Sequence, residues 1–391
     1  MNVDKLVSDI EEKVIGYRRE LHENPCLSEH EEDTCKRISS WLFDMNIEHE
    51  VVLDNKGIIA IIRGAKDGKT VALRADIDAL PVTEMTTLSY KSKTNGVMHA
   101  CGHDAHTAIA LGAACILKKL ENKLEGNVKI FFQPAEETIG GAERLISVGC
   151  LENPYVDNVI GLHLSPEYPA NTVAFKYGKM YAGSDMFDII LTGKGCHGAH
   201  PENGCDTIAM SAQVISTLQT VVSRNVSPTN SAVVTIGKIH GGTGGNIICD
   251  KVVMTGIIRT LDQETRLFLR ERVQSVVEDV ASAFGGKGEF VLRPSYAPLV
   301  NDNVVVEQTK DVAVKVLGKD NVIIKENPSL GCEDFAFFAQ ERPSCFYDLG
   351  SGYIDREENY PLHNPMFEPN ECCLKTGVLL QVSATLALLK K

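Results

Sequence analysis

The chain has 391 residues, a length at which one hydrophobic core is uncommon, so two domains are expected. Hydrophobic residues make up 43% and charged residues 23% of the sequence, as in an ordinary globular protein, and the formal net charge of -13 disfavours nucleic acid and anionic membranes as partners. The sequence starts without a secretory pattern and has no run near the ~18 apolar residues of a membrane helix. We therefore expect a cytoplasmic protein with reduced cysteines.

The first hundred residues begin with two predicted helices. Apolar residues recur at three- and four-residue steps over residues 3–21, which predicts a helix that Asn24-Pro25 ends. Ser28 and Glu31 match a capping box, which predicts the start of a second helix carrying Trp41.

Strands and helices then alternate, which is typical of a mainly parallel sheet with helices on its faces. Strands are expected at residues 57–62, 70–73, 128–132, 159–164, 322–325 and 345–349, and helices at residues 106–120, 304–317 and 371–389. A strand-helix-strand-strand-helix unit interrupts this order, with strands at residues 186–191, 232–239 and 252–258 and helices at residues 207–222 and 265–284. The pattern predicts an α/β catalytic domain, residues 1–182 and 293–391, into which a smaller α+β domain, residues 183–292, is inserted.

A cluster of metal-binding residue types lies between His99 and His106. Cys101 and His103 are two residues apart, and Gly102 between them permits a turn that lets both face one site. Thiolate and imidazole are good ligands for zinc and suit other divalent ions. By itself the pair fits a buried cysteine beside a capping histidine equally well.

Three further segments carry candidate ligands. Glu136 and Glu137 follow an apolar strand, so one could bind metal while the other acts as a base. His163 lies at the end of another apolar strand, and His363 lies on a loop between two prolines. Each signal alone has an ordinary structural explanation, but together they supply enough donors for two divalent ions that share a ligand.

The ordered motifs resemble the metal-dependent aminoacylase and carboxypeptidase superfamily. The similarity is closest to its amidohydrolase branch, which includes hippurate hydrolase, indole-acetyl-amino-acid hydrolases and N-acetyl-diaminopimelate deacetylase. The motifs span nearly the whole chain, at residues 18–25, 72–81, 99–106, 131–137, 331–335 and 362–365. The resemblance implies hydrolysis of the amide bond of an N-acyl amino acid with two divalent ions, whether zinc, manganese, cobalt or nickel.

The resemblance also implies a role for each matching residue. The implied metal ligands are Cys101, His103, Glu137, His163 and His363, with Cys101 as the bridge between the ions. Glu136 matches the general base, and Asp78 matches an aspartate that orients a ligand. The wider superfamily has a ligand histidine where this chain has Asp76, which fits the recruitment of Cys101 and His103.

The inserted domain carries the features of a lid and dimerisation domain in the resembled family. His197 matches a histidine that reaches the scissile carbonyl, and Asn246 and Arg259 match residues that contact the substrate or its carboxylate. The resemblance leaves open a monomer or a homodimer that pairs through the edge strand of this domain; in a homodimer, His197 could serve the partner's site. Cys332 stands where relatives have serine, and no role is assigned to it.

Two other functions compete with amide hydrolysis of N-acyl amino acids. A metallo-dipeptidase or exopeptidase of the same superfamily would need an acidic group for the substrate amine, and the sequence offers no clear candidate. A non-catalytic binding protein should have lost the base or a ligand, whereas every matching position is filled here.

Overall fold

The computed structural model describes residues 2–390, and these residues form two compact units. The larger unit runs from the N-terminus to Gly178 and also contains Val300–Asn327 and the segment from Asp334 onward. The smaller unit comprises Lys179–Leu299 and Pro328–Glu333. The expected role of the smaller unit as a lid or dimerisation domain stays a prediction.

The larger unit is built on an eight-stranded sheet in the order β1-β2-β4-β3-β5-β16-β6-β15. The pairings β4-β3, β3-β5, β5-β16 and β6-β15 are parallel, and the other three are antiparallel. The strands are β1 (Glu48–Val52), β2 (Gly57–Arg63), β3 (Lys66–Asp76), β4 (Glu125–Gln133), β5 (Asn158–Pro169), β6 (Val173–Phe175), β15 (Val322–Ile324) and β16 (Ser344–Gly352). This mainly parallel sheet confirms the predicted α/β class.

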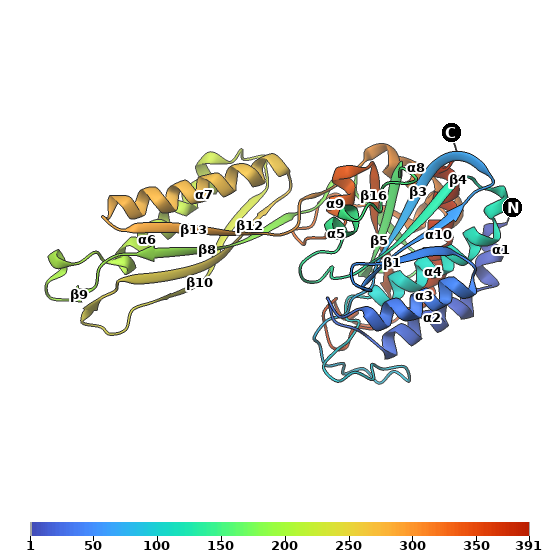
Figure 1. Ribbon diagram of the computed structural model, residues 1–391, viewed down its shortest axis with the longest axis horizontal. Helices are drawn as coiled ribbons and strands as arrows, with labels where there is room; N and C mark the ends of the chain where they lie inside the picture. The colour runs from blue at the N-terminus through green and yellow to red at the C-terminus, as the bar shows by residue number, and fades with distance from the viewer. Residues whose placement is uncertain (1, 391) are drawn as a thin grey trace. The chain divides into compact units, whose positions relative to one another are not determined.

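Helices cover both faces of this sheet (Figure 1). They are α1 (Val3–Ser8), α2 (Glu11–Glu23), α3 (Glu32–Asp44), α4 (His103–Lys119), α5 (Ala142–Ser147), α8 (Asn303–Leu317), α9 (Ala336–Glu341) and α10 (Cys372–Leu388). On β4, Phe131 stacks on Phe338 of α9, whereas Phe132 belongs to the core that α4 and α10 share. Because both faces are buried, the central strands read as continuous apolar runs rather than alternating ones.

The structure differs from two expectations near the N-terminus. The first predicted helix is broken between α1 and α2, where the backbone leaves helical geometry at Ile10 (φ -120°, ψ 3°). The capping box of Ser28 and Glu31 is wrong, because α3 begins at Glu32 and its N-cap makes no side-chain hydrogen bond. Both side chains instead contact distant parts of the larger unit, described below.

The smaller unit has a four-stranded antiparallel sheet in the order β10-β12-β8-β13. Its strands are β8 (Gly183–Thr192), β10 (Ala232–Gly241), β12 (Lys251–Thr260) and β13 (Lys287–Pro294), and its helices α6 (Thr207–Thr220) and α7 (Gln263–Ala283) pack against the sheet. A separate pair is formed by β9 (Cys196–His197) and β11 (Ile247–Ile248). The sequence did not predict β13. In this strand half-buried residues alternate with exposed ones, and none of its residues is fully buried.

No helix in the described part of the chain is both long and apolar enough to cross a lipid bilayer.

Candidate metal centre

The candidate site forms where the central strands of the larger sheet end. Asp76, the last residue of β3, pairs with Gln133, the last residue of β4. On the other side of β3, Arg74 pairs with Gly161 of β5, which places His163 level with Asp76 two residues further along. Parallel strands thus bring polar side chains from distant segments to one edge, where open α/β sheets gather their functional groups.

Cys101 and His103 reach this edge from the start of α4. Gly102 between them has φ +88°, a left-handed conformation that favours glycine. A Cβ atom at Gly102 would also lie 2.8 Å from Leu164 Cδ1, so a side chain at this position would require Leu164 to shift. The expected turn at Gly102 is therefore present, and it directs the thiol and the imidazole to the same side.

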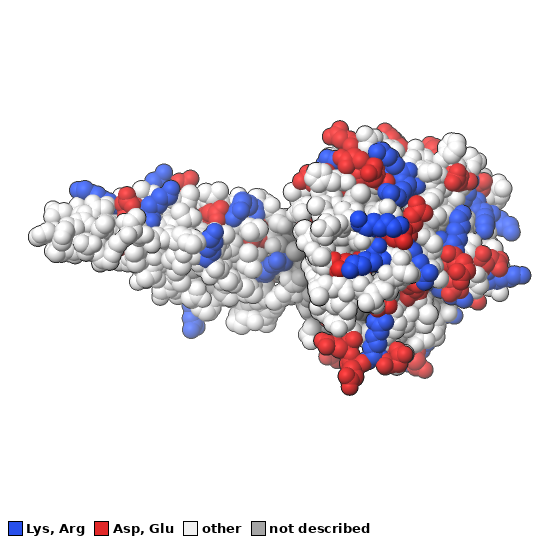
Figure 2. Space-filling model, turned by 90° about the horizontal axis from the view of Figure 1, so that it is seen from below, with Lys and Arg blue, Asp and Glu red and all other residues white. Residues whose placement is uncertain are grey.

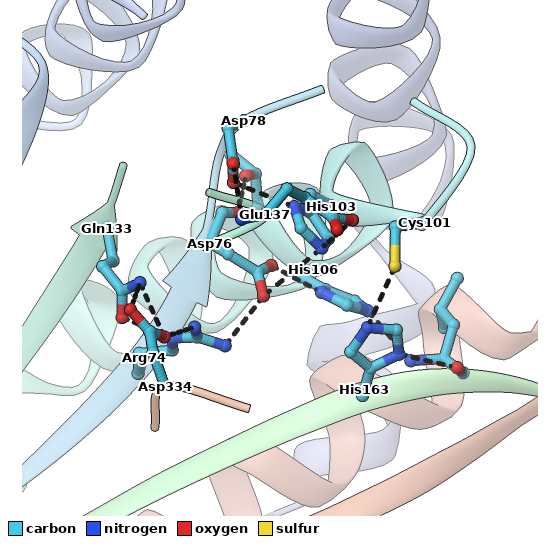
Figure 3. Close-up of polar contacts among 12 residues, drawn as sticks. Arg74, Asp76, Asp78, Cys101, His103, His106, Gln133, Glu137, His163 and Asp334 are labelled. Carbon is cyan, nitrogen blue, oxygen red and sulfur yellow. Dashed lines mark hydrogen bonds and ion pairs between the residues drawn. The ribbon is translucent and has the colours of Figure 1, made fainter. Parts of the chain in front are cut away.

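The five candidate ligands fall into two groups that share one residue. Donor atoms of Cys101, His103 and His163 lie within 4.8 Å of one another, and so do those of Cys101, Glu137 and His363. Figure 3 shows Cys101 beside His163, with His103 and Glu137 close together. Cys101 is thus placed where one thiolate could contact two ions.

Asp78 fixes the orientation of His103. Its Oδ1 lies 3.1 Å from His103 Nδ1, and its Oδ2 accepts hydrogen bonds from Ser28 Oγ at 2.6 Å and from the amide of Glu137 at 3.0 Å. With Nδ1 donating to a carboxylate, the lone pair of His103 lies on Nε2. That buried Nε2 has no hydrogen-bond partner among residues 2–390, which suits a position that a cation would fill.

His163 is oriented by the main chain. Its Nδ1 donates to the carbonyl of Leu164 at 2.8 Å, which leaves Nε2 directed at Cys101 Sγ, 3.4 Å away. Neutral imidazole with one free lone pair is the form that binds a metal.

His106, which the sequence analysis left without a role, supports this strand end. Its Nε2 accepts the amide N–H of Leu164 at 2.9 Å, so its Nδ1 carries the proton and donates to Asp76 Oδ1 at 2.6 Å. Both ring nitrogens are therefore occupied, which excludes His106 as a ligand in this arrangement. Arg74 Nη1 donates to the other oxygen of Asp76 at 2.7 Å, so Asp76 is likewise satisfied.

Glu136 and Glu137 lie on the loop that follows β4. Both carboxylates have an oxygen within 4.8 Å of a His103 ring nitrogen and of each other. His363 Nε2 lies 3.3 Å from Glu137 Oε1, and the amide of His363 donates to the carbonyl of Ala100 at 2.8 Å, which ties its loop to the segment of Cys101. The larger unit thus brings together all the predicted ligands, the predicted base and Asp78.

Charge and burial together shift the pKa values of the site residues. Burial lowers the pKa of His103, but the carboxylates of Asp76 and Asp78 outweigh it and raise the pKa to about 10. Burial raises the pKa of Glu137, but His363 and His103 hold it at about 2. Burial and the neighbouring Glu137 raise the pKa of the Cys101 thiol well above its usual range, whereas a bound cation would favour the thiolate.

Asp334 anchors the far end of the loop that carries the glutamate pair. Its Oδ2 accepts the amides of Gly141 and Ala142 at 2.8 and 3.0 Å, and its Oδ1 accepts Arg74 Nη2 at 2.7 Å. Gln133 Nε2 donates to both oxygens of the same carboxylate, as Figure 3 shows. Asp334 lies within the motif at residues 331–335, but the sequence alone did not predict a role for it.

The three predicted substrate-contacting residues lie on the smaller unit, and they are not all close together. His197 pairs with Ile247, the neighbour of Asn246, and this pair follows the end of β8 at Thr192. Arg259 instead pairs with Ser184 at the start of β8. The eight strand steps between these ends span about 26 Å, so one small substrate cannot contact both groups of a single smaller unit.

The chain belongs to Peptidase family M20/M25/M40, whose family model matches residues 72–385. It is 40% identical over 379 residues to the "N-acetyl-L-cysteine deacetylase" of Bacillus subtilis, covering 97% of this chain and 89% of that protein. It is 38% identical over 383 residues to the "Thermostable carboxypeptidase 2" of Saccharolobus solfataricus, covering 96% of each. These findings confirm the resemblance on which the sequence analysis relied.

A solved Bacillus subtilis structure, described as a dinuclear metal binding peptidase from the M20 family, superposes with a TM-score of 0.85 at 34% identity. The match covers 98% of this chain and 99% of that one, so both the larger sheet and the inserted unit have counterparts in it.

Proposed function

We propose that the protein is a metal-dependent amidohydrolase that cleaves the amide bond of N-acyl amino acids. The observation that carries the proposal is the pair of donor groups sharing Cys101, with the carboxylate of Glu136 beside them. The deacetylase relative, which is matched along nearly its whole length, supports an N-acyl amino acid as the substrate.

The residues at the site fit two divalent ions. Cys101, His103 and His163 would hold one ion, and Cys101, Glu137 and His363 the other. The buried His103 Nε2, which has no hydrogen-bond partner within residues 2–390, and the buried carboxylates of Asp76 and Asp78 beside His103 favour a cation at this place. When bound, the ions activate water and polarise the scissile carbonyl.

Glu136 is the group that moves protons in this proposal. Its carboxylate takes a proton from the attacking water as the water oxygen bonds to the carbonyl carbon, and it returns that proton to the amine as the carbon–nitrogen bond breaks. The products are a carboxylic acid and a free amino acid. Asp78 takes no part in the proton transfer, but it keeps His103 Nε2 directed into the site.

The test replaces Glu136 with Gln and with Ala and measures acetyl, benzoyl, indole-acetyl and longer acyl amino acids with several metals. We expect both variants to retain their metal and to lose about 10²–10⁴-fold in kcat. Full activity in either variant would remove Glu136 from the mechanism.

A carboxypeptidase or dipeptidase is the second candidate, and the Saccharolobus solfataricus relative favours it. Parallel assays on acetyl amino acids and on dipeptides separate the two activities. Faster turnover of dipeptides would replace the proposed substrate class while keeping the metal site and the base.

We also propose a homodimer formed through β10, with His197 and Asn246 completing the partner's site. This strand is at the edge of its sheet, and Ile239 on it is 49% exposed. Figure 2 shows few charged side chains over much of the smaller unit on the side viewed, which suits contact with a second copy. The separation of about 26 Å between the two ends of β8, one followed by His197 and the other paired with Arg259, is consistent with sites that are shared between copies.

Two measurements test the dimer. Light scattering should report a dimer for the parent and a monomer for Ile239→Lys, because a charge on an edge strand opposes strand pairing. Mixing inactive His197→Ala with inactive Glu136→Ala should restore activity only if each site takes His197 from the other copy.

A further inference from the structure

The buried carboxylate of Glu31 lies beneath the loop that carries the glutamate pair. Glu31 is 0% exposed, and its Oε1 accepts two main-chain amides, those of Glu29 and Ala135, each at 2.9 Å. The contact with Ala135 joins residues 104 positions apart in the sequence. Glu31 therefore connects the start of α3 to the loop after β4, and α3 does not use its side chain as a cap.

Both amides that Glu31 accepts belong to residues in an unusual conformation. Glu29 has φ +68° and Ala135 has φ +56°, so both non-glycine residues adopt left-handed geometry. Such residues are uncommon and strained, and they persist where the surroundings determine them. Glu31 Oε1 accepts both amides and thereby stabilises the left-handed conformation of Glu29 and of Ala135.

The conformation of Ala135 sets the direction of the next side chain, that of Glu136. On the other side of Glu136, the amide of Glu137 donates to Asp78 Oδ2 at 3.0 Å. Glu136 thus lies between two amides that are each held by a buried carboxylate, Glu31 before it and Asp78 after it. Asp78 is in turn held by Ser28 Oγ at 2.6 Å, so the segment at residues 28–31 supports both anchors.

We propose that Glu31 is a positioning residue for the general base, holding Ala135 in the left-handed conformation that directs Glu136 at the reacting water. The inference rests on the proposed function, since it assigns Glu31 an effect on the proton transfer. This role requires a hydrogen-bond acceptor at the position of Glu31 Oε1, within reach of the Ala135 amide.

The test compares Glu31→Leu with Glu31→Gln in the full-length protein loaded with metal. Leucine fills similar space but accepts no hydrogen bond, so the loop is free to relax and kcat should fall about 10²-fold, as misplacement of a catalytic group by about 1 Å does. Glutamine retains an acceptor oxygen, so kcat should stay within about threefold of the parent. KM and metal content should change little in both, because the ligands stay in place.

Thr34→Val serves as the matched control on the same helix. The Thr34 hydroxyl is buried and makes no hydrogen bond with any residue the structure describes, so this variant changes a buried polar group of α3 without touching the loop. It should keep the parent kcat. If Glu31→Leu does not fold, Glu31→Asp replaces it, since the shorter side chain cannot reach both amides and should lose at least about tenfold in kcat.

The outcomes distinguish the two proposals. A parent enzyme that hydrolyses no N-acyl amino acid contradicts the proposed function, whatever the variants do. Parent turnover with an unchanged kcat in Glu31→Leu, or an equal loss in Glu31→Gln, overturns the positioning role. Loss of metal in Glu31→Leu also overturns it, because the effect would then act through the ligands rather than through Glu136.

Discussion

Replacing His106 with leucine tests the contact that supports the strand end of His163. The exchange removes the donor to Asp76 Oδ1 and the acceptor for the amide of Leu164. The fully buried Asp76 carboxylate keeps the hydrogen bond from Arg74 but loses the one from His106. The amide of Leu164 loses the acceptor that His106 provides.

The magnitude follows from those two losses. A buried group left without its partner costs about 1–3 kcal/mol, and a charged group costs more. His106→Leu should therefore lower the free energy of unfolding by about 3–5 kcal/mol, a large share of the ~5–15 kcal/mol typical of a folded protein. At about 2–4 °C per kcal/mol, the melting temperature should fall by about 6–20 °C.

Tryptophan fluorescence of the metal-free protein measures this loss. Trp41 is the only tryptophan of the chain and packs on Tyr17 in the larger unit, with ring centroids 4.6 Å apart. The fluorescence transition therefore reports the unfolding of the larger unit alone, without a contribution from the smaller one. Thermal and urea transitions should both shift.

His99→Leu is the matched control. His99 is also buried, but neither of its ring nitrogens has a hydrogen-bond partner within residues 2–390. The same exchange should therefore cost less than about 1 kcal/mol there. Equal destabilisation by the two variants, or an unchanged transition in His106→Leu, would refute the reasoning.

Three further predictions concern the ligands, acid stability and the smaller unit. Cys101→Ala should retain less metal after dialysis than His363→Ala, because Cys101 belongs to both donor groups; equal contents by elemental analysis would contradict a shared ligand. Although burial raises the pKa of Glu84, hydrogen bonds lower it from 4.5 to about 2, so its stabilisation is present above pH 4.5 and disappears as the pH falls toward 2. Glu84→Gln should remove most of this acid dependence, read from urea unfolding across that pH range. Asp185→Ala should destabilise the smaller unit by about 3–5 kcal/mol, because it leaves the buried Arg266 guanidinium without the carboxylate 2.7 Å away; unchanged resistance to limited proteolysis would contradict this.

The strands of the larger sheet were predictable to different degrees. Those buried on both faces, such as β4 and β5, are apolar runs that stand out in the sequence. The strand β1 lies at the edge of the same sheet and is mostly exposed, so its sequence has no apolar pattern that predicts a strand. The strand β13, at the edge of the smaller sheet, is also mostly exposed and was not predicted either. Burial alone does not decide which strands can be predicted, because the mostly exposed edge strand β10 was predicted from its β-branched residues, whereas the short buried strand β6 was missed.

The chemistry of the site could be predicted from the sequence because metal ligands and general bases must be particular residue types. Cys101, His103 and the glutamate pair follow from that requirement, and the family motifs extended it to His163 and His363. The sequence also indicated the turn at Gly102, since only glycine adopts its conformation readily.

Only the tertiary structure decided what supports those residues. Ser28 and Glu31 read locally as a capping box, yet Glu31 contacts an amide 104 positions away, and His106 accepts an amide 58 positions away. A local pattern cannot distinguish a side chain that caps its own helix from one that reaches a distant loop, because both need the same acceptor atom. The ligand types were therefore determined by the sequence, and their orientation by contacts that exist only once the strands have paired.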